Sequence, residues 1–164
     1  MRILLLLSAL AISSTCLAQD EPDENDLSYY TTTTVEQLRT TAMAAYEADC
    51  ASSLVDMENY ASAANSLANI ISVALDPYYD ASSRARDRVG RRLLNQLVEY
   101  ERTSNDYRRQ RNEAHIMIAE CQARNGMNDE AIASYAKALN NLSAEEAELW
   151  ERARTGLFAL IGVE

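Results

Sequence analysis

Glycine and proline are scarce in this chain of 164 residues, which has four glycines and two prolines. Runs of β-branched residues are nearly absent after Val35, and the helix formers Ala, Leu, Glu and Arg dominate the rest of the chain. Because β-branched and aromatic runs are what strands use, their shortage argues against a fold built on a sheet. The composition instead predicts an all-α protein.

The usual sequence signals of catalysis are also missing. The chain has no glycine-rich phosphate loop, no GxSxG turn and no HExxH element. Its single histidine, His115, has no nucleophile or orienting carboxylate at a telling spacing, so we interpret it as a packing or helix-surface residue. The carboxylates of Glu145, Glu146 and Glu148 lie near an expected helix start, where the helix dipole accounts for them. We therefore expect no enzymatic activity, no catalytic residue, no metal and no cofactor.

Long apolar runs are lacking except at the start of the chain, from Ile3 to Ile12. Arg2 precedes this run and small or polar residues follow it, which is the three-part pattern of a secretory signal peptide. The run is too short to cross a bilayer, which needs about twenty residues. We predict cleavage after Ala18, a mature chain without a transmembrane segment, and export to a bacterial periplasm. Lipid attachment at Cys16 is a minor alternative, because Ser13, Ser14 and Thr15 fit that signal poorly.

Only two cysteines, Cys50 and Cys121, would remain in the mature chain, 71 residues apart. That spacing fits no metal-ligand pattern. In an oxidising compartment the two residues can form a disulfide bridge. The alternative is a pair of small buried thiols on helix faces, which is common for free cysteine.

The mature chain divides into an acidic, flexible N-terminal segment, residues 19–32, and a helical domain, residues 33–164. Five carboxylates without apolar periodicity mark the first part. In the second part, apolar spacing, turns and caps predict helices over about 33–54, 60–76, 78–102, 107–124 and 128–140, and a sixth from the Ser143–Glu146 capping box onward. The first five helices are separated by a turn at 56–59, by Pro77, by an interruption at 103–105 with Asp106 as the next N-cap, and by a left-handed turn at Gly126. The third helix is expected to bury Ala85, Val89, Leu93, Leu97, Val98 and Tyr100.

Two segments of the chain are similar at an offset of 68 residues, which aligns Ala63 with Ala131. This offset is twice the 34-residue period of the tetratricopeptide repeat. Residues 112–145 resemble that repeat through Ala119, Gly126, Asn128-Asp129-Glu130-Ala131, Tyr135 and Ala138, although His115, Gln122 and Ser143 depart from its usual residues. Residues 44–77 resemble it more loosely, through Ala51 and Ala63 among others, and residues 78–111 form a degenerate repeat.

The resemblance implies antiparallel helical hairpins stacked as a short α-solenoid, with the last helix as a cap. It also implies a non-catalytic adaptor or scaffold that binds another protein in a groove formed by the first helices of its repeats. Carried over from the best repeat, the groove residues are Asn112, His115, Ala119 and Gln122. Two other classes stay open: a helical bundle that binds a small ligand, and a small exported enzyme or enzyme inhibitor.

Positive charge is concentrated in one segment, since nine of the fifteen Lys and Arg residues lie between Arg84 and Arg111. Against four carboxylates these give the segment a net charge of +5, in a chain whose total is −10. The basic strip predicts an acidic partner protein or a polyanionic polymer, with Arg108 and Arg111 as contact residues. Alternatively, the acidic lead-in and the glutamate-rich final helix neutralise it within the molecule. Nucleic acid is not an expected partner of an exported chain.

Overall fold

The computed structural model describes residues 30–163. The predicted signal peptide, Cys16 and most of the acidic lead-in therefore lie outside the described residues. The described part is all-α, as predicted, and contains six helices and no strand. The helices are α1 Thr32–Ala48, α2 Leu54–Tyr79, α3 Ser83–Arg86, α4 Arg91–Arg124, α5 Asn128–Asn141 and α6 Ala147–Ile161. Among these residues no helix is both long enough and apolar enough to cross a membrane.

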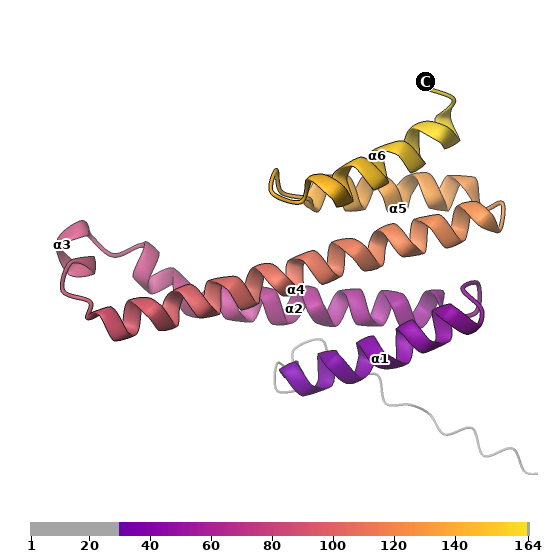
Figure 1. Ribbon diagram of the computed structural model, residues 1–164. Helices are drawn as coiled ribbons and strands as arrows, with labels where there is room; N and C mark the ends of the chain where they lie inside the picture. Colours follow the sequence, from indigo (N-terminus) through magenta and orange to yellow (C-terminus); the bar gives the residue numbers. More distant parts are fainter. Residues whose placement is uncertain (1–29, 164) are drawn as a thin grey trace, which may run out of the picture.

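The five long helices lie side by side in chain order, each running opposite to the one before it (Figure 1). The 34-residue α4 is the central element, because it takes part in both hydrophobic cores. Ala114 and Ile118 face a core shared with α1 and α2, whereas Ile116 and Ala119 face a second core shared with α5 and α6. Both faces of this helix are therefore covered over its C-terminal half.

The turn between the first two helices lies at residues 49–53, so the predicted turn at 56–59 was wrong. The Asp49 carboxylate accepts a hydrogen bond from the Ala51 backbone N–H (3.1 Å), which is a local alternative to continuing the helix. Residues 56–59 instead belong to α2, where Met57 is fully buried. Ala51 is exposed in this turn, although the alignment of residues 44–77 with the repeat places it in a first helix.

Residues 103–105 do not interrupt a helix, so the predicted break and the Asp106 N-cap were also wrong. The Thr103 hydroxyl donates to the Glu99 carbonyl one turn back (2.8 Å). The Ser104 hydroxyl donates to the Ala68 carbonyl of α2 (3.0 Å) and is itself buried. These hydroxyls are satisfied inside the helix pair, and α4 continues. Pro77 likewise lies within the last turn of α2, which ends at Tyr79 rather than before the proline.

Beyond the hydrogen bond between Ser72 and Ser104, residues 73–103 project as a two-helix arm with α3 at its tip (Figure 1). The arm extends past α1, α5 and α6, so no third helix covers it. Its predicted buried edge is therefore largely exposed: Leu93 exposes 48 %, Val98 53 % and Tyr100 52 % of its surface. The segment interpreted as a degenerate repeat, 78–111, contains the end of α2, all of α3 and more than half of α4.

The predictions for the turn after α4 and for the start of α5 were accurate. Gly126 has φ of 75°, a left-handed conformation that glycine adopts without steric cost. Helix α5 then begins at Asn128, where it was expected. The Glu146 carboxylate accepts from the Ser143 backbone N–H (2.9 Å), which is one half of the predicted capping box, but α6 begins only at Ala147 and Ser143 is not its N-cap. Helix α6 buries Leu149 and Ala153, whereas Ile161 is exposed.

Gly156 allows α6 to approach α5 closely, a role that the sequence did not reveal. A Cβ atom at this position would collide with the ring and hydroxyl of Tyr135, which is 4 % exposed and cannot move freely. We expect Gly156→Ala to lower the free energy of unfolding by about 1–3 kcal/mol, the usual cost of overpacking a core. Urea denaturation would measure this loss. Gly90→Ala is the control for loss of a glycine, because a Cβ there meets nothing within 4 Å.

Candidate functional site

The four groove residues predicted from the repeat lie together on α4, but they are covered by neighbouring helices. Asn112 and Ala119 have no exposed surface, and His115 and Gln122 expose 7 % and 8 %. The Gln122 side chain accepts a hydrogen bond from the Ser134 hydroxyl of α5 (2.8 Å). In this conformation a partner can touch His115 and Gln122 only at their edges. Partner binding by these residues stays a prediction, and their visible role is packing.

Asn112 is the centre of a buried polar network that joins three helices. Its Nδ2 donates to the Asn141 carbonyl (3.2 Å) and to the Glu146 carboxylate (3.1 and 3.2 Å). Its Oδ1 accepts from Nε and Nη2 of Arg111 (3.0 and 2.8 Å). Because every polar atom of this amide is paired, the network stabilises the α4–α5–α6 junction.

Arg108 and Arg111, the two predicted contact residues of the basic strip, are hydrogen-bonded to α2. Arg111 Nη1 donates to the Asn65 carbonyl oxygen (2.6 Å), and Arg108 Nη2 donates to the Ser72 hydroxyl (2.7 Å). Burial lowers the pKa of the Arg111 guanidinium, and the positive charge of Arg108 lowers it further. Neither guanidinium forms an ion pair with a carboxylate in the described residues. Both side chains therefore contribute to the fold, whatever they do for a partner.

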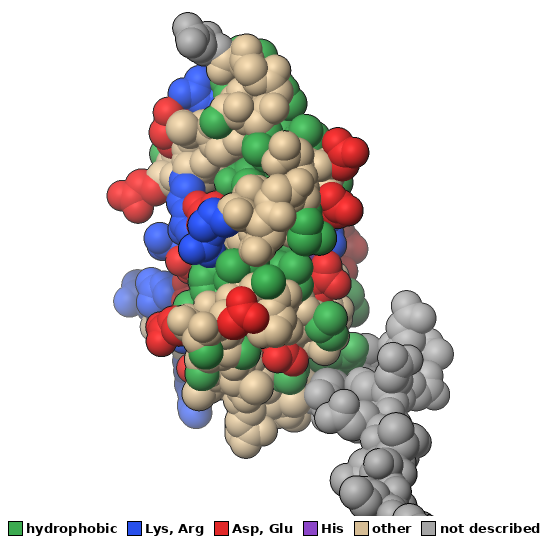
Figure 2. All heavy atoms as spheres, turned by 90° about the vertical axis from the view of Figure 1, so that its right-hand side faces the viewer, with side chains coloured by type: hydrophobic (Ala, Val, Ile, Leu, Met, Phe, Trp, Pro, Cys, Tyr) green, Lys and Arg blue, Asp and Glu red, His purple; other side chains and the backbone are tan. Residues whose placement is uncertain are grey.

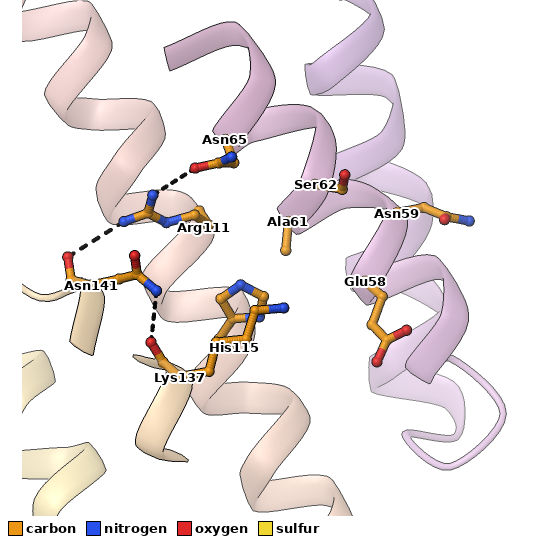
Figure 3. A pocket seen from close by; sticks show the side chains of 9 residues that line it. All are labelled: Glu58, Asn59, Ala61, Ser62, Asn65, Arg111, His115, Lys137 and Asn141. Atoms are coloured by element: carbon orange, nitrogen blue, oxygen red, sulfur yellow. Dashed lines mark hydrogen bonds between the residues drawn. The ribbon is translucent and has the colours of Figure 1, made fainter. Parts of the chain in front are cut away.

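A polar cavity of about 570 Å³ opens where α2 and α5 diverge above α4, and we call it the α4 crevice (Figure 3). It is lined by Glu58, Asn59, Ala61, Ser62, Asn65, Arg111, His115, Lys137 and Asn141. Arg111 and His115 come from α4, and Lys137 comes from α5. Figure 3 shows the imidazole ring of His115 lying between the Lys137 side chain and Ala61 of α2. The lining is mainly amide, hydroxyl and charged, unlike the apolar walls of most small-molecule sites.

His115 exposes only 7 % of its surface and forms no hydrogen bond within residues 30–163, but its ring nitrogens are not sealed from solvent, because the side chain borders the open crevice. Its pKa is lowered from the ordinary 6.5 to about 4, chiefly by burial, then by the charge of Lys137, then by that of Arg111. The imidazole is therefore neutral at pH 7, and a ring nitrogen faces the crevice with capacity for a hydrogen bond. From the sequence, His115 is expected to be a packing or helix-surface residue and, through the resemblance, a groove residue, but its open surroundings could not be predicted.

The disulfide between Cys50 and Cys121 is present, with the two Cα atoms 5.8 Å apart. It joins the α1–α2 turn to the last turn of α4. The Asn125 amide donates to the Cys121 carbonyl (2.8 Å) and lies 3.4 Å from the Cys121 sulfur. Within the described part of the chain, no group of three His, Cys, Asp or Glu residues is arranged to hold a metal ion.

The tip of the arm carries the second candidate surface, which we call the arginine tip: Arg84, Arg86, Arg88, Arg91 and Arg92. Arg86 donates to the Tyr79 carbonyl (3.2 Å), and the other four are exposed. None of the five forms an ion pair with a carboxylate of residues 30–163. Figure 2 shows the opposite end of the molecule, where acidic side chains are scattered over the surface. The final helix, one predicted source of neutralising charge, packs against α5 and lies away from the arm (Figure 1).

The arginine tip lies within the predicted basic strip, although Arg108 and Arg111 are the contact residues that the sequence predicts. Helix pairing distinguishes Arg108 and Arg111 from the arginine tip. Residues 108 and 111 face α2, whereas residues 84–92 connect helices at a free end. The resemblance to the tetratricopeptide repeat stands on the residues quoted for it, since no family model, no curated protein and no solved structure matches this chain.

Proposed function

We propose that this protein is an exported, non-catalytic adaptor of the tetratricopeptide-repeat type that binds a partner protein with an acidic surface. The observation that carries the proposal is the arginine tip, which places five arginines and one aspartate within nine residues. Charges that a fold leaves unpaired at a projecting end steer and orient an oppositely charged partner. Exposed Leu93 and Val98 follow on the same arm and add apolar contact area.

The hairpin formed by the end of α4 and by α5 supports the repeat-like part of the proposal. Ala119, Ala131 and Ala138 are fully buried, and Tyr135 is 4 % exposed. These are the small and large positions by which such hairpins pack. The disulfide is in keeping with export, because such bridges persist in oxidising compartments.

Neutralising Arg91 and Arg92 together tests the proposal. A photoreactive residue at exposed Asn95 should give a discrete protein adduct in cells that make the protein. In the Arg91→Gln/Arg92→Gln variant we expect about five- to thirtyfold less adduct, because two exposed charge pairs at about 0.5–1 kcal/mol each are lost. Both arginines lie in the first turn of α4, where the helix dipole disfavours cations, so their loss should not destabilise the helix.

The matched control is Arg39→Gln/Arg109→Gln, which makes the same change in net charge on exposed positions away from the arginine tip. Its adduct yield should equal that of the wild type. Equal loss in both variants would mean a general charge effect, and an adduct with lipid alone would mean a membrane surface. Either result would reject the proposal that the partner is an acidic protein.

A ligand-binding bundle is the second candidate function, because the α4 crevice has the volume of a small-molecule site. Its wide opening and polar walls do not suit a buried apolar ligand. A native mass spectrum that shows a copurified small molecule would favour this candidate over the adaptor.

A further inference from the structure

His115 is the only histidine of the chain, and its imidazole borders an open cavity in which no side chain of residues 30–163 forms a hydrogen bond with it. A polar side chain that is more than nine-tenths buried normally has a hydrogen-bonding partner. Here the surrounding helices supply none among the described residues, and the ring nitrogens remain open to solvent from the crevice. The unused nitrogen is therefore available to a ligand in the α4 crevice.

The charges nearest to this ring are positive. Lys137 of α5 and Arg111 of α4 both lower the pKa of His115. Lys137 has no carboxylate within 4 Å in the described chain, and the donors of Arg111 are taken up by neutral amide and carbonyl oxygens. Glu58 of α2 is the one acidic group of the lining, and it does not offset the two cations at the ring. The Glu146 carboxylate offsets part of the charge of Arg111, so an anion placed beside His115 would meet a positive field that comes chiefly from Lys137.

We propose that the α4 crevice binds a carboxylate, held between the Lys137 amine and the His115 imidazole. A single negative charge fits because Lys137 is the one cation with unused donors, since most of those on Arg111 are occupied. A phosphate dianion would need a second free cation and would be repelled by Glu58. The carboxylate can belong to a free organic acid or to the C-terminus of a peptide, which offer the same chemistry to the site.

Binding is coupled to a proton. A carboxylate beside the ring favours the imidazolium form, and the imidazolium in turn donates a charge-assisted hydrogen bond to the carboxylate. The ligand therefore raises the pKa of His115, and the crevice binds carboxylate more tightly as the pH falls towards that pKa. The positive charges of Lys137 and Arg111 oppose protonation of His115 when the crevice is empty, and the bound anion offsets these charges.

Because the chain has one histidine, its imidazole resonances report on this site without ambiguity. We would titrate the full mature protein by NMR alone, with acetate, and with an acetylated trialanine that has a free C-terminus. Acetamide and the C-terminally amidated trialanine are the uncharged controls. We expect at least one of the carboxylates to raise the pKa of His115 by about one unit or more, the effect of an opposite charge at contact distance.

The four arms give decisive outcomes. A rise with acetate identifies a small organic acid as sufficient, and a rise with the trialanine acid alone identifies a peptide terminus. No rise with either acid, or an equal rise with the amides, overturns the proposal. These outcomes are independent of the arginine tip, which can bind its partner whether or not the crevice takes a carboxylate.

Lys137→Gln supplies a second test that does not depend on folding defects, because this side chain is exposed. Loss of the cation should raise the pKa of His115 in the empty protein and should shrink the rise caused by the carboxylate. Arg109→Gln, an exposed change outside the crevice, should leave both values as in the wild type. A ligand-induced rise that is as large in Lys137→Gln as in the wild type would contradict the proposed site.

Discussion

Reduction of the Cys50–Cys121 bridge is expected to lower the free energy of unfolding by about 4 kcal/mol. The bridge joins residues 71 positions apart, and the loop that it closes contains α2, α3 and nearly all of α4. A cross-link over so long a loop restricts the unfolded chain strongly, and the cost of its loss grows slowly with loop length. The bridge therefore restricts the unfolded chain over the segment that forms the central helix pair and the whole arm.

Equilibrium urea unfolding with and without a reductant would measure the effect. The Cys50→Ala/Cys121→Ala variant should show about the same loss and should no longer respond to the reductant. Alanine suits position 121 because the side chain there is fully buried, and a serine hydroxyl would have to find a new partner. A reductant that leaves the wild-type midpoint unchanged would show that the bridge contributes little. If the reductant also changed the stability of the double variant, the reductant would be acting on something other than this bridge.

The parts of the fold that the sequence predicted well are those set by local chemistry. Gly126 ends α4 because only a left-handed turn fits there, and the alanine spacing of α5 gives its buried face directly. The break expected at 103–105 failed for the opposite reason. Ser104 is a poor helix former by itself, but a carbonyl of α2, 36 residues away in the chain, takes its hydroxyl. Such a partner is invisible to local pattern analysis.

The candidate sites show the same limit. His115 was visible as a lone histidine, but its empty surroundings depend on how far α2 and α5 diverge above it. Arg111 looked like a free surface charge, whereas Asn65, 46 residues away, holds it. Leu93 and Val98 carried a helical apolar pattern that predicted burial, yet no third helix reaches the arm. In each case the sequence does not show where the neighbouring helices end, and therefore does not show which residues they cover.

The two proposed surfaces belong to one helix but lie far apart on it. Twenty residues separate Arg91 at the arginine tip from Arg111 in the crevice, which is about 30 Å at 1.5 Å for each residue. One is an exposed charge cluster that responds to salt, and the other is a recessed site that responds to protons. A single partner that engaged both would need an acidic surface and a carboxylate about 30 Å from it.

Acidification is the second large effect that we expect, and it originates at His115. The imidazole has a pKa of about 4 in the folded protein and 6.5 as the reference value for the unfolded chain. As the pH falls below 6.5 the unfolded chain takes up this proton first, so the folded state loses relative stability until the pH reaches about 4. Each unit of the difference corresponds to about 1.4 kcal/mol. Because the ring borders an open crevice, we expect a total loss of about 2–3 kcal/mol.

Replacement of His115 by glutamine isolates this contribution from that of the carboxylates, which also titrate below pH 5. Between pH 6 and pH 4.5 the wild type should lose stability more steeply than His115→Gln, by up to about 1.4 kcal/mol for each pH unit. Urea unfolding at a series of pH values measures both slopes, and parallel curves would contradict a neutral, desolvated His115. A saturating carboxylate in the crevice should flatten the wild-type curve alone, because it brings the pKa of the folded state closer to that of the unfolded chain.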